Sequence, residues 1–398
     1  EASRQLINCC NIDPRQVLAV GISSQRATFV PLDRHGNPLT RFIGWQDRRS
    51  IEQCAEMERR LGAERYYRIA GMPIEPTASV SKILWLKENQ PEIFEQTSQF
   101  ASTQNVHLRQ MGVAEAPCDL PCAAYMGLLD VDRLEWSAEL LEALEIPAEK
   151  MPPLTPSCTR VGEISPAAAE ATGLAAGTPL VVAGGDLQVA GLGMGISQPG
   201  LVSVGIGTGG GVLIYLERPL RHPQRALNCL PHAAPGAWEM EGICLASGAA
   251  YKWYRDTLSQ LEKASAAALD LEAYDLLNAE AARAAPGAGG VLVMPAMAGS
   301  GAPNWYSKAR GVVLGLSLAT DKKQLTRAVL EGISFGFYHH LVVLEERGLH
   351  ATHARVTNGG ARSPLWKQIT ADVLGLRLEH IAQHPGSSLG AAFVAGMG

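Results

Sequence analysis

One carboxylate of the chain stands where it could act as a base. The stretch from Val181 to Asp186 reads VVAGGD, an apolar strand-like run followed by two glycines and an aspartate. A second apolar run then leads into the turn GIGTGGG, which begins at Gly205. An aspartate at the end of a rigid strand, with a phosphate-sized turn behind it, is expected of an enzyme that deprotonates a hydroxyl beside a nucleotide. Asp186 is therefore the first candidate catalytic residue, although it is also consistent with the cap of a helix that begins at Leu187.

The glycine-rich turn matches the pattern GxGxxG from Gly205 to Gly210. That pattern binds dinucleotides when a helix follows it, because the pyrophosphate lies at the helix N-terminus. Here the β-prone run VLIYL follows, so we expect a hairpin; a helix after Gly211 would instead favour an NAD-dependent dehydrogenase. A hairpin can bind phosphate through its backbone amides, with Thr208 adding a hydroxyl. A tight hairpin without a ligand is the alternative interpretation.

Two polar segments near the N-terminus have the composition of a sugar site. GISSQR ends a predicted strand with Gln25 and Arg26, and WQDRR combines the indole of Trp45 with Asp47 and two arginines. Sugars and polyols are bound by carboxylates, amides and guanidinium groups against an aromatic face. We therefore expect these four residues to bind a polyol, while the two adjacent arginines alone would fit a solvated surface.

A third small-residue segment, NGGARS, follows a predicted strand and leads into a helix. Ser363 is expected to cap that helix and Pro364 to be its first residue. Gly360 and Ala361 would let a flat base or a ribose approach the backbone. A plain strand-to-helix turn is the other possibility for this segment.

Composition limits the class of partner. The chain has 398 residues, of which 46% are hydrophobic and 18% charged, enough for two or three domains with full cores. A net charge of -5 without long basic runs argues against nucleic acid or an anionic membrane as the main partner. Residues 187–216 carry no charge, but their nine glycines favour a buried sheet over a membrane span. Small molecules are the expected ligands.

The cysteines point to a reducing compartment. None of the eight belongs to a CxxC pair or to a zinc-type Cys/His spacing. The N-terminal residues show no basic-then-apolar leader. We therefore expect reduced thiols and a cytoplasmic protein.

Strands and helices alternate along both halves, which indicates the α/β class. Strands are predicted over residues 16–23, 29–32, 180–183, 201–204, 212–216, 291–294 and 355–357. Helices are predicted over residues 51–62, 81–89, 137–144, 248–261, 321–346 and 364–375, and from residue 388 onward. A domain boundary is expected near residues 193–200.

Taken in order, seven segments of the chain resemble the FGGY family of carbohydrate kinases. They are GISSQR, GWQDRRS, CDLPCAAYMGLLDVDRLEWS, VVAGGDLQVAGLGMG, VSVGIGTGG, MPAMAGSGAPNW with ARGVVLGL, and TNGGARSPLWKQITADVLG. The resemblance implies two actin-like (ribonuclease H-like) ATPase domains flanking a cleft. Residues 1–196 would form the sugar-binding domain and residues 197–398 the nucleotide-binding domain. The implied activity is transfer of the γ-phosphoryl group of Mg-ATP to a hydroxyl of a sugar or polyol.

The same resemblance implies roles for individual residues. Asp186 would be the general base and a possible ligand, through water, of Mg²⁺. The substrate would lie against Gln25 and Arg26. The residues implied for ATP binding are Gly207, Thr208, Gly209, Gly248, Gly299, Gly301, Gly360 and Ala361.

Three departures bear on the substrate. Glycerol kinases keep a glutamate where this chain has Ala27, a tyrosine where it has Leu120, and a glutamine where it has Leu187. Xylulokinases usually have Met-His where this chain has Arg26 and Ala27. The segments PEIFEQ and VVAGGD nevertheless resemble the corresponding segments of xylulokinases. The expected substrate is therefore a ketopentose, with glycerol or another polyol as the alternative. A non-catalytic sugar-binding or regulatory relative is the rival from another class, and a homodimer is possible.

The two ends also depart from the family pattern. The family begins with a strand bearing Asp-x-Gly-Thr, its first phosphate loop, which is absent before GISSQR, and it continues beyond the helix that ends here at Gly398. We expect the sequence to be part of a longer chain. A protein that lacked both segments would be expected to show little or no kinase activity.

Overall fold

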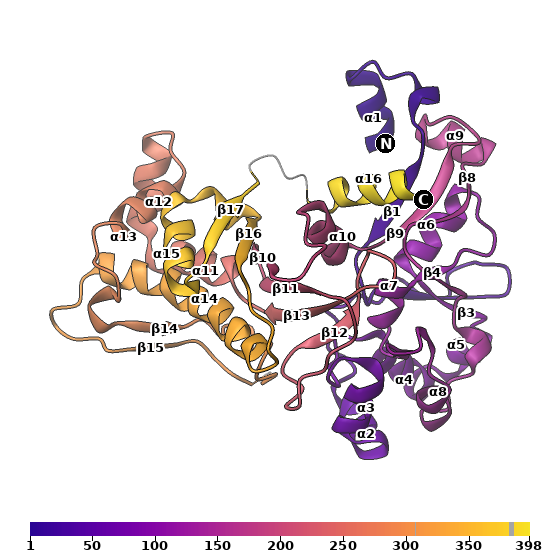
Figure 1. Ribbon diagram of the computed structural model, residues 1–398, viewed down its shortest axis with the longest axis horizontal. Coiled ribbons are helices and arrows are strands. Elements are labelled where there is room, and N and C mark those ends of the chain that lie inside the picture. The colour runs from indigo at the N-terminus through magenta and orange to yellow at the C-terminus, as the bar shows by residue number, and fades with distance from the viewer. Residues whose placement is uncertain (307, 382–385) are drawn as a thin grey trace.

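The computed structural model describes residues 1–306, 308–381 and 386–398. The described elements form two lobes, which meet around α10 (Asp186–Gly193) and β10 (Leu201–Ile206) (Figure 1). Strands and helices alternate in both lobes, so the predicted α/β class is confirmed. None of the described helices is both long and apolar enough to cross a membrane.

A three-stranded sheet, ordered β1-β9-β8, forms the centre of the N-terminal lobe. β1 (Val20–Ser24) is parallel to β9 (Pro179–Gly185), and β8 (Thr159–Glu163) is antiparallel to β9. β9 is apolar on both faces because helices cover both. Its even positions, Leu180 and Val182, belong to the core that includes α6 (Thr103–Met111), whereas Val181 and Ala183 pack with α16 (Ser387–Met397).

Helix α16 follows the C-terminal lobe in the sequence but packs on the N-terminal lobe. It packs against α10, β1 and β9 of the N-terminal lobe, although it is the last element of the sequence (Figure 1). A division of the chain at residues 196 and 197 would assign this helix to the other domain. We therefore propose that residues 387–397 belong with the N-terminal lobe.

A helical layer completes the N-terminal lobe. Its elements are α2 (Ile51–Leu61), α3 (Ala63–Ala70), α4 (Ser79–Asn89), α5 (Pro91–Gln96), α7 (Leu120–Ala124), α8 (Ala138–Ala143) and the paired strands β2 (Phe29–Leu32) and β3 (Gln99–Ser102). The apolar side chains of these elements share one core around Tyr66, Ile83 and Phe100. Six further elements belong to this lobe, namely the helices α1 (Ala2–Cys9) and α9 (Pro166–Thr172) and the strand pairs β4 (Cys118–Asp119) with β7 (Leu154–Thr155) and β5 (Leu129–Asp130) with β6 (Glu135–Trp136).

The C-terminal lobe contains a six-stranded sheet with the order β12-β13-β11-β10-β16-β17. Its other strands are β11 (Gly210–Leu216), β12 (Asn228–Pro231), β13 (Trp238–Cys244), β16 (His353–Thr357) and β17 (Arg377–His380). The helices are α11 (Gly248–Leu258), α12 (Gln260–Ala268), α13 (Ala273–Ala281), α14 (Lys322–Glu345) and α15 (Pro364–Leu374). β14 (Leu292–Met294) pairs with β15 (Val312–Leu314) beside α14.

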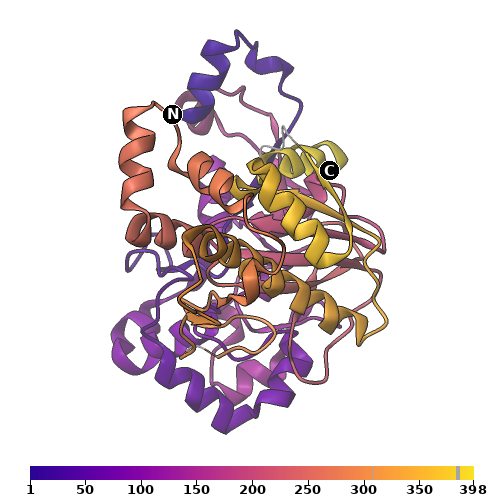
Figure 2. The same ribbon diagram turned by 90° about the vertical axis from the view of Figure 1, so that its left-hand side faces the viewer.

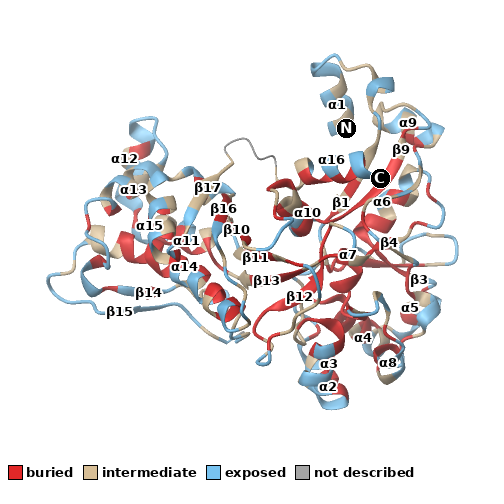
Figure 3. Cartoon of the chain, viewed as in Figure 1, coloured by how far each residue is buried: buried red, intermediate tan, exposed pale blue. Residues whose placement is uncertain are grey.

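Burial follows the strands. In Figure 3 the central strands of both lobes are red, while the outer faces of the helices are pale blue. Figure 2 shows the orange and yellow helices of the C-terminal lobe in front of its strands. Phe337 of α14 is fully buried and belongs to the same core as Val204 and Ile206 of β10.

Three local predictions were wrong in detail. The first strand begins at Val20, because Pro14–Gln16 forms a 3₁₀ turn after Asp13. The helix expected over residues 248–261 ends at Leu258, and α12 starts separately at Gln260. The sequence SIEQ is a capping-box pattern and predicts that Ser50 caps α2, but the Ser50 hydroxyl instead forms a 2.9 Å hydrogen bond with Ser81 in the core.

Candidate active site

Asp186 lies where β9 ends and α10 begins. β1 and β9 are parallel, with Ser24 opposite Gly185, so the residues that follow both strands emerge at the same edge of the sheet. The Asp186 side chain is 52% exposed, and its Oδ1 accepts a 3.0 Å hydrogen bond from the N–H of Leu187. Asp186 is thus the first residue of the helix rather than its cap, and its carboxylate remains open to a ligand.

Arg26 is brought beside this carboxylate. Its Nε lies 3.9 Å from Asp186 Oδ1. Nη1 and Nη2 donate to the two oxygens of Glu241 at 2.7 and 3.0 Å, and the guanidinium lies 3.9 Å above the centre of the Tyr125 ring. The arginine expected to touch substrate is therefore also one half of a bidentate ion pair, and its Nε edge faces Asp186.

Gly185 makes this arrangement possible. A Cβ at this position would lie 2.6 Å from Arg26 Cδ and 2.6 Å from Gln188 Oε1. Such distances are shorter than real carbon contacts allow. The absent side chain of Gly185 therefore leaves the space in which Arg26 passes close to α10.

The other three predicted substrate residues lie on the same lobe but are not drawn into this contact. Gln25 is exposed, and its carbonyl accepts a 3.2 Å hydrogen bond from Thr103. Trp45 is 40% exposed, and its backbone N–H donates to the hydroxyl of Thr28 at 3.3 Å. Among the described residues, no hydrogen bond or ring contact joins the side chain of Trp45 to Arg26 or Asp186.

Asp47 is already engaged by a neighbour. Its carboxylate accepts from Arg49, with Nη2 2.7 Å away, and this interaction lowers the pKa of Asp47. The Arg49 guanidinium lies over Trp85 rather than Trp45, at 4.7 Å from the ring centre. The expected grouping of indole, carboxylate and guanidinium is therefore only partly formed.

The glycine-rich turn is a hairpin between β10 and β11, as predicted, so the helix that a dinucleotide fold requires is replaced by β11. The N-terminus of α11 holds this turn. Gly248 N–H donates to the carbonyl of Gly207 at 2.7 Å, and Ala249 N–H donates to that of Thr208 at 2.9 Å. A Cβ on Gly248 would lie 2.6 Å from the same Gly207 oxygen. Only glycine at this position allows the helix to approach the turn so closely.

The remaining predicted nucleotide residues converge on the same edge of the sheet. β16 runs parallel to β10, with Thr357 opposite Gly205, so Gly360 and Ala361 follow beside the hairpin. β13 ends next to the start of β11, with Cys244 opposite Gly210.

The Gly299 to Ala302 segment attaches to the end of β13. Ala302 N–H donates to the Ile243 carbonyl at 3.0 Å. Four segments of the chain therefore meet at this edge of the six-stranded sheet, namely residues 207–209, 248, 299–302 and 360–361. They form one surface although they are up to about 150 positions apart in the sequence.

Sequence reasoning missed four buried polar residues behind Asp186. Tyr125 donates a 3.1 Å hydrogen bond to Glu241, and Glu239 and Gln188 are fully buried. A signal was present, because the run WEMEG places two acids on the same face of an otherwise apolar strand. Acids in that position are rare unless they are paired or protonated.

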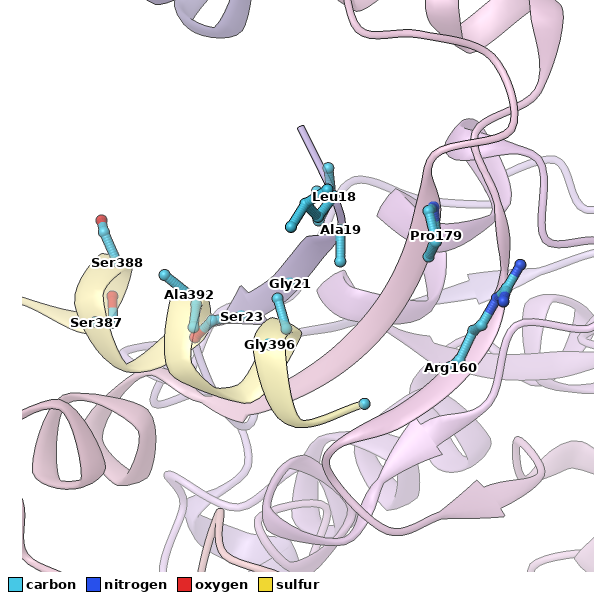
Figure 4. A pocket seen from close by; sticks show the side chains of 14 residues that line it. Leu18, Ala19, Gly21, Ser23, Arg160, Pro179, Ser387, Ser388, Ala392 and Gly396 are labelled. Atoms are coloured by element: carbon cyan, nitrogen blue, oxygen red, sulfur yellow. The ribbon is translucent and has the colours of Figure 1, made fainter. Parts of the chain in front are cut away.

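A separate cavity lies away from these residues. It has a volume of about 840 Å³ and lies between β1 and α16, where Gly21, Ser23, Ser387 and Ala392 line it (Figure 4). None of the predicted site residues lines it. The chemistry of the exposed carboxylate and the convergent turns, rather than cavity size, identifies the candidate site.

The chain is similar to known proteins along nearly its whole length. Residues 1–193 match the family model described as "FGGY family of carbohydrate kinases, N-terminal domain", and residues 202–398 match the model of the C-terminal domain of the same family. The chain is 33% identical over 407 residues to the glycerol kinase of Halorhodospira halophila, covering 99% of this chain and 77% of that protein. It is 29% identical over 399 residues to the xylulose kinase of Bacillus subtilis, covering 100% of this chain and 77% of that protein.

The fold has close counterparts among solved structures. The ligand-bound xylulose kinase from Lactobacillus acidophilus matches with a TM-score of 0.90 at 24% identity, covering 99% of this chain and 78% of that one. This likeness establishes the two-domain actin-like ATPase architecture. Since the two family matches together span nearly all of the sequence, the chain belongs to the FGGY family of carbohydrate kinases.

Proposed function

We propose that this phosphotransferase uses Asp186 as the general base that activates a sugar hydroxyl. The observation that carries the proposal is the position of Asp186: an exposed carboxylate at the carboxyl edge of β9, with Arg26 Nε 3.9 Å away. A general base must be reachable by the proton that it removes, and this carboxylate is open to solvent on one side. The buried acids Glu239 and Glu241 do not meet that requirement.

In the proposed reaction, Asp186 accepts the proton of the attacking hydroxyl while that oxygen approaches the γ-phosphorus in line. The bond between the γ-phosphorus and the bridging oxygen of ADP breaks as the new oxygen–phosphorus bond forms. Arg26 steadies the Asp186 carboxylate from one side, so that its other oxygen is directed to the substrate. Most of the rate would come from positioning and charge stabilisation.

The nucleotide side fits the triphosphate of ATP. Gly207, Thr208 and Gly209 form a turn whose carbonyls are tied to α11, and a Cβ on Gly207 would come within 3.1 Å of Gly209 O. The backbone therefore leaves little room for a side chain at Gly207, and bare glycines let backbone amides approach phosphate oxygens. We assign Gly248, Gly299, Gly301, Gly360 and Ala361 to the same nucleotide surface.

Mg²⁺ is compatible with these residues. Magnesium in kinases is held by one or two carboxylates together with phosphate oxygens and water. The half-exposed Asp186 supplies such a carboxylate. When bound, the ion neutralises charge on the phosphates.

For the acceptor we propose a ketopentose, with glycerol as the alternative. Ala27 is 5% exposed, so it offers a buried methyl group where glycerol kinases present a carboxylate, and Leu120 and Leu187 also replace polar side chains. A site that lacks these hydrogen-bonding groups discriminates against a substrate that needs them. The similarity to a xylulose kinase supports the ketopentose, whereas the similarity to a glycerol kinase supports the alternative.

A coupled assay of ADP release tests the proposal. Full-length protein is incubated with Mg-ATP and, separately, with ketopentoses, glycerol, other polyols and aldonic acids. We expect turnover with one ketopentose to exceed that with glycerol. Preferential turnover of glycerol would overturn the substrate assignment, and turnover of no acceptor would favour a non-catalytic sugar-binding relative.

A further inference from the structure

Two carboxyl groups are buried side by side beneath the candidate site. Glu239 and Glu241 are two residues apart on β13, so their side chains point to the same face of the sheet. Both are 0% exposed. Glu241 is fully satisfied by Arg26 and Tyr125, whereas neither oxygen of Glu239 has a hydrogen-bond partner among the described residues.

The charges do not balance if both acids are ionised. The Arg26 guanidinium is the cation of this cluster, and its two terminal nitrogens are given to Glu241. A second carboxylate would be buried without a counter-ion, and a buried acid in that position takes a proton instead. Burial and the adjacent Glu241 charge raise the pKa of Glu239 well above its ordinary value of 4.5, against a smaller opposing effect of Arg26.

Within the described part of the chain, the other groups around Glu239 do not supply a cation. The Gln188 amide lies near enough to affect the pKa of Glu239, yet outside hydrogen-bonding geometry, and its own nitrogen and oxygen are also unpartnered. Tyr215 is the cross-strand neighbour on β11, and its ring packs against the His232 ring.

The nearby titratable groups are also neutral. Burial lowers the pKa of His232 to about 4 and raises that of Cys229 to about 11. Burial likewise raises the pKa of Tyr125. Because these described groups are neutral, the positive charge that faces the two acids is that of Arg26.

We propose that Glu239 holds a proton while Glu241 carries the negative charge, so that Arg26 has a single counter-ion and keeps its Nε edge toward Asp186. Glu239 and Glu241 are then positioning residues for the proposed base. A deprotonated Glu239 would compete with Glu241 for the guanidinium and draw it away from the 3.9 Å contact with Asp186. The link to catalysis rests on the proposed function of Asp186, whereas the proton on Glu239 does not.

The proton can be tested without any activity. Infrared spectra of the full-length protein above neutral pH should contain a protonated carboxyl band, and Glu239→Gln should remove the component that Glu239 contributes to it. Glu241→Gln should also remove that component, because Glu239 would then ionise to pair with Arg26. The exposed Glu135→Gln on β6 should leave the band unchanged. Burial also raises the pKa of Asp119, which can contribute a band of its own. Wild-type protein without this band, or a spectrum that Glu239→Gln leaves unchanged, therefore overturns the proposal.

The pH dependence of melting gives a second test. A raised pKa means that folded protein binds more protons than unfolded protein above pH 4.5, so this group's contribution to stability falls as pH rises through that window. Glutamine does not titrate. The melting temperature of Glu239→Gln minus that of wild type should therefore increase by about 2 °C for each pH unit above pH 4.5. A difference that is independent of pH overturns the proposal.

The positioning role is tested by kinetics, with whichever acceptor the screen identifies. Glu241→Gln should lower kcat by about 10- to 100-fold with little change in the KM for ATP. At neutral pH, Glu239→Gln should have a kcat close to that of wild type. At alkaline pH, Glu239→Gln should remain active, whereas the activity of wild type declines. Equal kcat values in Glu241→Gln and wild type would overturn the positioning role. If no acceptor is turned over, the proposed function fails while the spectra and melting curves still decide whether Glu239 is protonated.

Discussion

Arg26 and Glu241 form a bidentate ion pair across 215 positions of sequence, with Nη1 2.7 Å from Oε2 and Nη2 3.0 Å from Oε1. Arg26 follows β1 of the N-terminal lobe, and Glu241 lies in β13 of the C-terminal sheet. The pair therefore joins the lobe that carries Asp186 to the sheet whose edge carries the glycine-rich turn. Its parallel donors match the geometry of a carboxylate, which a lysine cannot reproduce.

Arg26→Lys should consequently lower the free energy of unfolding by about 1 to 3 kcal/mol, because one oxygen of the buried Glu241 loses its partner. Chemical denaturation measures the change. Arg49→Lys is the matched control, since Arg49 and Asp47 form a pair of the same 2.7 Å length with Arg49 39% exposed. The control should change stability by less than about 0.5 kcal/mol. Equal effects of the two substitutions would contradict the importance of burial.

Much of the local architecture could be predicted because its signals lie within a few residues. The strand before Asp186 and the hairpin around Thr208 follow from apolar runs and glycines. Ser363 caps α15 by accepting from Trp366 N–H at 3.1 Å, as expected from the sequence. In α14, Asp321 and Gln324 form a capping box at the helix start. Such interactions need no distant partner.

The polar network behind Asp186 could not be predicted in the same way. Which acid meets Arg26 depends on how β13 is placed against the N-terminal lobe, and no local pattern contains that information. The alternation of Glu239 and Glu241 within an apolar strand marks two buried acids but does not name their partner. Ser50 failed as a predicted cap for a related reason, since Ser81, 31 positions away, competes for its hydroxyl.

Asp186→Asn should reduce kcat by about 10² to 10⁴-fold, the usual contribution of a general base, because the amide cannot accept the hydroxyl proton. ATP affinity should change little, since the proposed nucleotide surface lies on the other lobe. The coupled assay gives kcat, and equilibrium binding of ATP gives the affinity. Asp372→Asn, an exposed aspartate of α15, is the control. Undiminished turnover in Asp186→Asn would rule out its role as the base.

Gly248→Ala should weaken the use of ATP. The new methyl group would lie 2.6 Å from the Gly207 carbonyl, so either α11 or the turn has to move. We expect the KM for ATP to rise by about 10- to 100-fold while the KM for the sugar stays nearly constant. Gly396→Ala in α16 is the control, because no heavy atom lies within 4 Å of its added Cβ. A similar rise in both KM values would indicate general unfolding rather than displacement of the turn.

A buried histidine fixes the loop that carries Gly299 and Gly301. His340 of α14 is 0% exposed, and its Nε2 lies 2.9 Å from the Ala302 carbonyl, which accepts a hydrogen bond from the neutral ring. Burial lowers the pKa of His340 from 6.5 to about 4, with a smaller contribution from His339. The loop is therefore held by a ring that must remain uncharged.

Stability should accordingly fall in mild acid. Between pH 6.5 and about 4 the unfolded chain binds a proton at His340 that the folded protein does not, so the free energy of unfolding decreases as pH falls through this window. The difference of 2.5 pKa units corresponds to about 3 kcal/mol for this group. His340→Gln should flatten this part of the stability curve, measured by denaturation at several pH values, although His232, also lowered to about 4, keeps a residual slope. The exposed neighbour His339→Gln should leave the slope as in wild type. An unchanged slope in His340→Gln would show that the buried ring is already protonated or does not titrate in this range.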